Sequence, residues 1–384
     1  MEHFIFQYPV RQHFGEGCAE KAVKKEMENV GSNVLLAYGG SSLKRTRLYD
    51  KICSWLAECG KNVTDFGGIT PNPTYAKAQE GARIVREQGI DFILAVGGGS
   101  VIDCCKIVSA QARTDADIWE MEYTGHLLPT EFVPMGVVVT ASGTGAEQNN
   151  GAVITHETKK LKQALFGAYY SFAVLDSDLT KTLPMKQVVS GAFDTLSHCM
   201  ETYMGKPQST NLSDEINEAV MRNVIKNLRA LIANPDDDFA RGELMWASAM
   251  AENGMLKLGK QTDFQCHMIE HAVGAYTDCN HGQGLAVIHP ALYRHLLDCG
   301  KVKLARMAEK VWGVKGADEA EAAAAGIDAL ESFIKEIGMP ARWSEMGITD
   351  ESVLRAAADT CLIVPGCCRL LSRDEIFEIL KERM

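Results

Sequence analysis

Residues 91–106 read DFILAVGGGSVIDCCK, and this stretch decides the fold class. The apolar run before the glycines is typical of a buried strand, and the three glycines lead into a segment with helical spacing. Backbone N–H groups in such a turn, with the positive end of the helix dipole, can approach a pyrophosphate closely. The glycines do not follow the GxGxxG pattern. This turn alone is therefore also compatible with a tight structural connection.

The same alternation of strand and helix precedes this stretch. Residues 33–40 (NVLLAYGG) and 61–68 (KNVTDFGG) predict strands, while residues 43–60 and 72–89 predict helices that end at glycines. Further strands are expected at 134–140, 151–155 and 172–176. Strand, helix and strand in this order favour right-handed crossovers and an α/β fold with a doubly wound, mostly parallel sheet.

The pattern changes near residue 184. From Met185 onward the apolar residues recur at helical spacing, with hardly any β-rich run. A chain of 384 residues is also too long for one typical core. We therefore predict two domains, an α/β domain over 1–184 and an all-helical domain over 185–384.

The composition argues against several classes of function. A net charge of −11 would repel a phosphate backbone, so we expect no nucleic-acid partner. The N-terminal residues lack the features of a signal peptide, and no apolar run is long enough to span a bilayer, so we expect no membrane partner.

Twelve cysteines are too dilute for a disulfide scaffold. We expect reduced thiols and a cytoplasmic protein.

Three loops rich in small residues follow three of the predicted strands. They begin at Gly39, at Gly97 and in the stretch VVVTASGTGAEQ (137–148). If these strands are parallel, the loops leave the same edge of the sheet and form a floor for an extended dinucleotide. Read together, the three loops favour nucleotide binding over structural turns.

The first of these loops bears on the choice of nicotinamide cofactor. NAD-binding proteins usually place a carboxylate at a strand end to bind the ribose 2′-hydroxyl, and this carboxylate would repel a 2′-phosphate. Here Gly39 and Gly40 occupy that place, and hydroxyls and cations follow them, namely Ser41, Ser42, Lys44 and Arg45. The pattern favours NADP(H), although Asp65 at the end of the next strand offers NAD(H) an alternative.

Residues of the types that bind metals recur at helical spacing in the second half. Asp194 and His198 are four residues apart, as are His267 and His271, and His281 follows in the stretch NHGQG. Residues four apart project from the same face of a helix. A carboxylate and several imidazoles favour a divalent ion such as Fe²⁺ or Zn²⁺. The spacing leaves open which of the five residues bind it.

The chain resembles the iron-containing (group III) alcohol dehydrogenase family, and in particular its butanol dehydrogenase branch. The motifs that carry the resemblance extend over nearly the whole chain: HFIFQYPVRQHFGEG, YGGSSLK, FGGITPNPT, ILAVGGGSVIDCCK, TASGTGAEQN, GAFDTLSH, CHMIEHAVGAYTDCNHGQG and GMPARWSEMGI. The resemblance implies a dinucleotide-binding α/β domain followed by a helical metal-binding domain, with the metal in the cleft between them. It also implies a dimer, for which the β-rich N-terminal segment is a candidate pairing element.

The resemblance also implies roles for individual residues. The metal ligands would be Asp194, His198, His267 and His281, while His271 would lie beside the nicotinamide and relay a proton. The resemblance implies cofactor binding by Gly97, Gly98, Gly99, Ser100, Asp103, Thr140, Thr144 and Lys162, and we also expect it of Gly39, Gly40, Ser41, Ser42 and Asn72. At two positions, Gln148 and Phe264, the chain has a different residue from the one that is common in the family. Both positions bear on the shape of the substrate pocket.

The implied activity is reversible hydride transfer between NADP(H) and a small or medium-chain primary alcohol/aldehyde pair, such as butanol and butanal. The alternative is an NAD- and metal-dependent lyase of the dehydroquinate synthase type. That enzyme needs a strongly basic pocket, whereas mainly Met, Phe, Cys and Ala surround the proposed ligands in the sequence. The sequence therefore favours the dehydrogenase.

Overall fold

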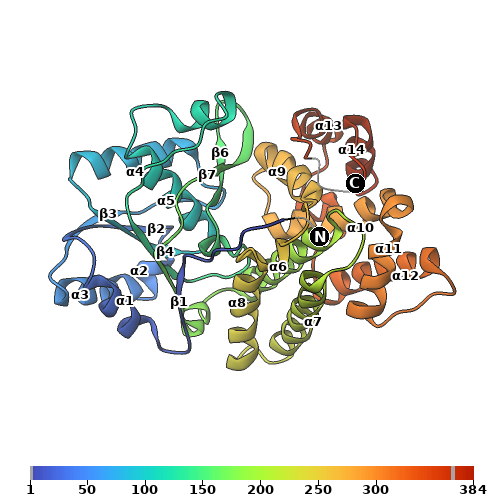
Figure 1. Cartoon of the computed structure of the whole chain (residues 1–384), viewed down its shortest axis with the longest axis horizontal. Coiled ribbons are helices and arrows are strands. Elements are labelled where there is room, and N and C mark those ends of the chain that lie inside the picture. Colours follow the sequence, from blue (N-terminus) through green and yellow to red (C-terminus); the bar gives the residue numbers. More distant parts are fainter. Residues whose placement is uncertain (1–2, 365–367) are drawn as a thin grey trace. The chain divides into compact units, whose positions relative to one another are not determined.

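The computed structural model describes residues 3–364 and 368–384. The chain divides into two compact units (Figure 1). The first, here called the α/β unit, comprises Gln7–Leu183, and the second, here called the helical unit, comprises Pro184–Met384 together with residues 3–6. The short N-terminal segment thus groups with the helical unit, although our division at residue 184 assigned it to the first domain.

Among the described residues, one parallel sheet of six strands forms the centre of the α/β unit, in the order β1-β8-β5-β4-β2-β3. These strands are β1 (Arg11–Phe14), β2 (Asn33–Tyr38), β3 (Asn62–Phe66), β4 (Phe92–Gly97), β5 (Met135–Val139) and β8 (Phe172–Leu175). The inner strands β2, β4, β5 and β8 are almost wholly buried, as their unbroken apolar runs predict. The prediction of a parallel α/β sheet is confirmed.

The strand predicted at 151–155 forms part of a separate hairpin. β6 (Gly151–His156) pairs with β7 (Leu161–Phe166) in antiparallel register. β7 was not predicted, because Lys162 and Gln163 are polar and yet buried, which hides the usual alternation of apolar and polar residues.

Helices cover both faces of the parallel sheet (Figure 1). α1 (Ala19–Met27) and α3 (Leu48–Glu58) share one core with the alternate side chains Val34 and Leu36 of β2. α4 (Tyr75–Glu87) and α5 (Gly99–Gln111) pack together on the other face. The predicted helix at 43–60 is interrupted, because Arg47 has a left-handed backbone (φ 59°) that separates α2 (Ser42–Arg45) from α3.

The helical unit contains no strand within its described residues. Its helices are α6 (Met185–Met204), α7 (Leu212–Ala233), α8 (Asp238–Glu252), α9 (Gln265–Thr277), α10 (His281–His295), α11 (Leu297–Met307), α12 (Glu319–Glu336), α13 (Glu351–Thr360) and α14 (Arg373–Lys381). They pack around one hydrophobic core that includes Phe193, Leu228, Val273 and Leu285. Single 3₁₀ or π turns lie in this unit at Met255–Lys257, Ala308–Trp312 and Trp343–Met346, and in the α/β unit at Glu120–Thr124, Ala146–Gln148 and Ser177–Thr180.

The prediction that every cysteine is reduced is wrong for one pair. Cys299 of α11 and Cys368 form a disulfide with a Cα–Cα distance of 5.7 Å. The two residues are 69 positions apart in the chain, so only the tertiary structure reveals that they meet. Cys367 lies outside the described residues, and the other nine cysteines are free thiols.

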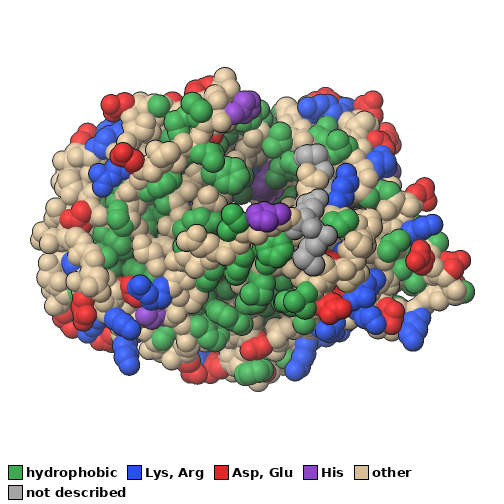
Figure 2. All heavy atoms as spheres, in the orientation of Figure 1, with side chains coloured by type: hydrophobic (Ala, Val, Ile, Leu, Met, Phe, Trp, Pro, Cys, Tyr) green, Lys and Arg blue, Asp and Glu red, His purple; other side chains and the backbone are tan. Residues whose placement is uncertain are grey.

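Charged side chains of both signs lie on the surface of the molecule. On the face in Figure 2, Lys and Arg are interspersed with Asp and Glu and do not gather into a stripe. Such a mixed surface gives this face no basic track for a nucleic-acid backbone. Within the described ranges, no helix is both long and apolar enough to cross a membrane.

Candidate metal centre and nucleotide loops

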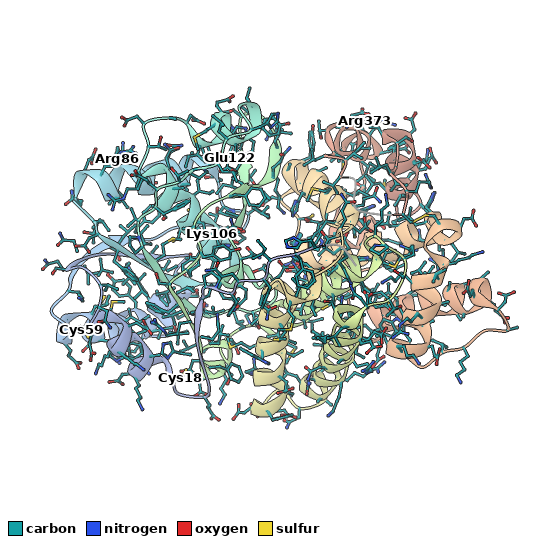
Figure 3. All side chains as sticks on the ribbon, viewed as in Figure 1. Cys18, Cys59, Arg86, Lys106, Glu122 and Arg373 are labelled. Carbon is teal, nitrogen blue, oxygen red and sulfur yellow. A yellow bond between two sulfur atoms is a disulfide. The ribbon has the colours of Figure 1, made fainter. Side chains whose placement is uncertain are left out.

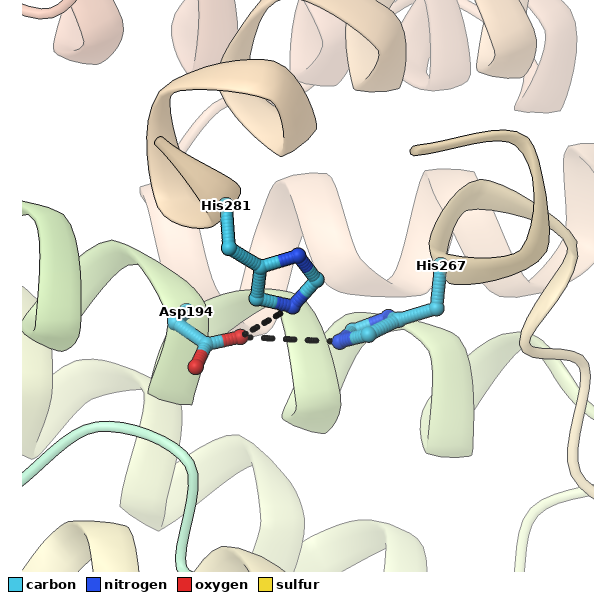
Figure 4. Close-up of side chains that lie close together, drawn as sticks. All are labelled: Asp194, His267 and His281. Carbon is cyan, nitrogen blue, oxygen red and sulfur yellow. Dashed lines mark ion pairs between the residues drawn. The ribbon is translucent and has the colours of Figure 1, made fainter. Parts of the chain in front are cut away.

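Four of the five predicted metal-binding candidates surround one point in the helical unit. Asp194 and His198 project from one face of α6, while His267 lies on α9 and His281 begins α10. The Nε2 atom of each histidine lies 3.5 Å from Oδ1 of Asp194. Figure 4 shows this arrangement for His267 and His281. The structure therefore brings together residues from three helices that the sequence separates widely.

This arrangement fits a divalent ion. Ligand atoms around a tetrahedral ion at about 2.1 Å lie about 3.4 Å from one another. Asp194 Oδ1 and His267 Nε2 are buried and have no hydrogen-bond partner among the described residues. Buried polar atoms without partners are costly, and one shared cation would satisfy both. Asp194, His267 and His281 also offer ligand atoms that all lie within 4.8 Å of one another, a set that does not include His198. His198 joins the centre through its 3.5 Å distance to Asp194 Oδ1.

The electrostatics of the cluster favour a bound cation. Burial would raise the pKa of Asp194, but the imidazoles of His198 and His281 hold that pKa well below its usual value. Burial would lower the pKa of His267, but the carboxylates of Glu201 and Asp194 raise it to about 10. The carboxylates thus outweigh burial and make the centre strongly attractive to positive charge.

Three glutamates that were not among the predicted site residues also lie at the centre. Each lies beside the Nδ1 atom of one histidine, and each is buried. The pairs are His198 with Glu252 at 3.0 Å, His267 with Glu201, and His281 with Glu270. For two of them a signal was available, because Glu201 is seven residues after Asp194 and Glu270 is three residues after His267. This spacing puts each on the ligand face of its helix.

The HGQG stretch allows α10 to begin beside α6. Asn280 caps the helix by accepting a hydrogen bond from Gln283 N (3.1 Å), and Ser190 Oγ donates to Asn280 Oδ1 (2.6 Å). A Cβ atom at Gly282 would lie 2.3 Å from the carbonyl oxygen of Ser190. Glycine is therefore required there for the approach that brings His281 to Asp194.

His271 lies in the same cluster. It is buried on α9, and its ring centroid is 6.0 Å from that of His267 and 5.4 Å from that of His281. With Glu270 and His281 it offers ligand atoms within 4.8 Å of one another. The structure therefore groups His271 with the ligand candidates, and its part in proton transfer stays a prediction.

The three predicted nucleotide loops lie together in the α/β unit. Since β5, β4 and β2 are adjacent and parallel, their loops leave the same edge of the sheet. Thr140 N donates to Gly97 O (2.9 Å), which joins two of the loops. A Cβ atom would lie 2.6 Å from Thr144 at Gly99 and 3.0 Å from Ala141 at Gly98. These glycines therefore permit a close contact between the loops.

The other predicted cofactor-binding residues lie on α5, on β7 and before α4. Ser100 is in the first turn of α5, and Asn72 has a left-handed backbone (φ 52°) just before α4. Asp103 of α5 accepts a hydrogen bond from Val153 N of β6 (3.0 Å). Lys162 is buried on β7. Asp103 thus also attaches the hairpin to the helix that follows the glycine loop.

A buried lysine that sequence reasoning missed holds one of the loops. The Lys106 ammonium group donates to Ala146 O (2.6 Å), Asn149 Oδ1 (3.1 Å) and Gly151 O (2.5 Å), and the side chain is fully buried (Figure 3). These bonds secure the segment that follows Thr144. The available signal was a lone cation inside an otherwise apolar helix.

The Asp65 carboxylate is engaged by aromatic side chains. Tyr38 donates a hydrogen bond to it (2.8 Å), and a bond from Tyr49 to Asp65, together with burial, raises the pKa of Tyr49. The Lys44 ammonium lies 5.2 Å and 4.8 Å from the centroids of the same two rings. These contacts orient the Asp65 carboxylate, and the residue stays exposed at the end of β3.

Comparison with known proteins decides the family. The model for "Iron-containing alcohol dehydrogenase" matches residues 9–177, and the model for the C-terminal part of the Fe-containing alcohol dehydrogenase family matches residues 188–384. The chain belongs to the iron-containing alcohol dehydrogenase family. The family assignment confirms the resemblance seen in the sequence and the prediction that the chain is an oxidoreductase of the alcohol dehydrogenase type.

Individual relatives in the family match over nearly the full chain. The chain is 36% identical to the probable NADH-dependent butanol dehydrogenase 1 of Bacillus subtilis, with 99% of each protein covered. It is also 36% identical to the NADPH-dependent aldehyde reductase YqhD of Escherichia coli, over 92% of this chain and 91% of that protein. The crystal structure of the NADH-dependent butanol dehydrogenase A of Thermotoga maritima aligns with a TM-score of 0.94 at 33% identity, covering 100% of this chain and 99% of that one.

Proposed function

We propose that this enzyme reversibly transfers hydride between NADP(H) and a small or medium-chain primary alcohol/aldehyde pair, with one divalent metal, Fe²⁺ or Zn²⁺, as its cofactor. The observation that carries the proposal is the convergence of three Nε2 atoms on Asp194 Oδ1, each at 3.5 Å. Asp194, His198, His267 and His281 would hold the ion. In this proposal residues 1–184 bind the dinucleotide and residues 185–384 bind the metal.

The chemistry requires a Lewis acid and a proton donor. A bound divalent ion would stabilise the negative charge that develops on the substrate oxygen, and the nicotinamide would supply the hydride. The three imidazoles are neutral ligands, so with a single carboxylate they leave the centre electrophilic. His271, one helical turn from His267, would hold the proton that the product oxygen needs.

The preference for NADP(H) rests on the loop after β2. The relatives are named for both NADH and NADPH, so the family does not decide between them. Gly40 offers open space, because a Cβ atom there would meet nothing within 4 Å, and Ser41 and Ser42 are exposed beside it. Asp65, the competing carboxylate, is bonded to Tyr38 and Tyr49. This loop therefore suits a 2′-phosphate.

The substrate proposal follows the relatives. Several are named butanol dehydrogenases, and YqhD is named an aldehyde reductase. The partially buried Phe264 ring, 5.2 Å from the His267 ring, places an apolar surface beside the proposed metal. The Lys257 ammonium lies 5.1 Å from the same ring, but it is paired with Glu252. An apolar surface favours a short aldehyde over the phosphorylated substrate of the lyase alternative.

Two further expectations belong to the proposal. β1 is one of the two edge strands of the sheet, and such an edge can pair with a second copy to form the expected homodimer. Light scattering of the purified enzyme would test the dimer. Cytoplasmic location stays a prediction.

One assay tests the proposed reaction. Enzyme reconstituted separately with Fe²⁺ and Zn²⁺ is given a panel of aldehydes and alcohols with NADPH, NADH or their oxidised forms, and absorbance of the reduced cofactor is followed. We expect consumption of NADPH with butanal and slower consumption of NADH. Equal rates would contradict the cofactor preference, and no consumption with any aldehyde would contradict the dehydrogenase.

A further inference from the structure

We infer that Glu201, Glu252 and Glu270 are positioning residues of the proposed metal centre, and that each holds one ligand histidine in the orientation that aims its Nε2 atom at Asp194. The inference rests on the metal binding in the proposed function and deepens it. It extends the centre from four residues to seven.

Each of the three imidazoles has a carboxylate oxygen near both of its nitrogens. On one side, Nε2 of each ring lies 3.5 Å from Asp194 Oδ1. On the other side, Nδ1 contacts a glutamate, at 3.0 Å for His198 and Glu252. When Nδ1 donates its proton to a carboxylate, Nε2 keeps the lone pair that a metal needs. A carboxylate beside Nδ1 thus favours the ring orientation that directs Nε2 to the centre.

Each glutamate comes from a different helix than its histidine. Glu252 of α8 reaches His198 of α6, Glu201 of α6 reaches His267 of α9, and Glu270 of α9 reaches His281 of α10. The three pairs therefore tie four helices around Asp194. Side-chain exposure is 4% for Glu252 and 0% for the other two. Burying a carboxylate this deeply costs folding free energy unless a paired or hydrogen-bonding group compensates for the lost hydration.

The remaining contacts of the glutamates show which one to change. Glu201 also accepts hydrogen bonds from Cys266 N (2.6 Å) and His267 N (3.2 Å), so it caps the start of α9. Its replacement would disturb that helix directly. Glu252 closes α8 and also pairs with Lys257 (2.8 Å), whose side chain is 31% exposed and can be solvated. Replacing Glu252 should therefore test the positioning role with less disturbance of the fold than replacing Glu201.

The decisive experiment measures metal binding and does not depend on turnover. Glu252→Gln preserves the shape of the side chain and removes its charge. Using metal-free protein and a competing chromogenic chelator, we expect the Zn²⁺ dissociation constant to rise about 10–100-fold. The visible spectrum of the Co²⁺-substituted protein should also change, while the far-UV circular dichroism of the metal-free protein stays the same. Glu243→Gln on the same helix, where the carboxylate accepts from Asn223 (2.6 Å), is the matched control.

The outcomes separate this inference from the proposed function. Equal Zn²⁺ affinity and equal Co²⁺ spectra in wild type and Glu252→Gln would overturn the positioning role. If that variant does not fold, Glu270→Gln is measured in the same way. Wild-type protein that binds no Zn²⁺ would overturn both ideas. Weakened binding in the variant, with no aldehyde reduction by either protein, would support the positioning role and overturn the proposed reaction.

Discussion

His271 is the residue whose role differs most from that of its neighbours. It shares α9 with His267, and its ring lies 5.4 Å from that of His281. We expect His271→Gln to retain one metal per protomer but to slow aldehyde reduction about 100-fold, because general acid catalysis typically contributes that much or more. Metal analysis and the rate at several pH values check this.

The control for that variant is His295→Gln. His295 ends α10 and lies 3.5 Å from Glu382, so its replacement should leave both metal content and rate unchanged. An unchanged rate of His271→Gln at every pH would remove His271 from the mechanism. Loss of the metal from His271→Gln would instead make it a ligand.

At the scale of elements, the start of α10 depends on one glycine. In Gly282→Ala the new methyl group would lie 2.3 Å from the Ser190 carbonyl oxygen, and a backbone atom cannot move aside as a flexible side chain can. We expect a loss of about 1–3 kcal/mol of stability from overpacking, with lower metal content because His281 is displaced. Thermal unfolding of the metal-free protein and metal analysis measure the two effects.

A second helical glycine provides the comparison. At Gly300 of α11 a Cβ atom would meet the end of the Met204 side chain at 2.9 Å, and that side chain can adjust. Gly300→Ala should therefore behave nearly as wild type. If Gly282→Ala matches it in melting temperature and metal content, the close approach of α10 is not what positions His281.

At the scale of the whole molecule, the two units should respond to different ligands. The helical unit holds all four proposed metal ligands, whereas the predicted nucleotide loops lie in the α/β unit. A ligand present at 100 times its dissociation constant stabilises the form that binds it by about 2.7 kcal/mol. We expect chelation to lower the unfolding temperature of the helical unit, and NADPH to raise that of the α/β unit.

Differential scanning calorimetry measures these unfolding temperatures, and we expect one transition for each unit. The metal-free Asp194→Asn variant serves as the control, since chelator should have no further effect on it. If chelation leaves the wild-type scan unchanged, or shifts only the transition that NADPH shifts, the metal is not held by the helical unit.

Much of the fold could be predicted because it is encoded locally. The unbroken apolar runs of β2 and β4 indicate buried parallel strands, and helical spacing after Met185 indicates the second unit. The break at Arg47 and the strand β7 were missed. Arg47 has a left-handed backbone that its residue type does not favour, and the polar Lys162 and Gln163 are buried in β7. In both places tertiary packing outweighs the local preference.

Local patterns in the sequence were enough to predict the parallel sheet, the helical half, the glycine loops and the chemical types of the metal-binding candidates. Spacing within a helix fixes which side chains share a face, so the pairing of Asp194 with His198 could be expected. The meeting of His267 and His281 with Asp194 at 3.5 Å became visible only in the folded chain. The tertiary structure also places Glu252 beside His198 and joins Cys299 to Cys368. The physical reason is that a periodic pattern specifies faces along one element, whereas distances between elements depend on how all of them pack.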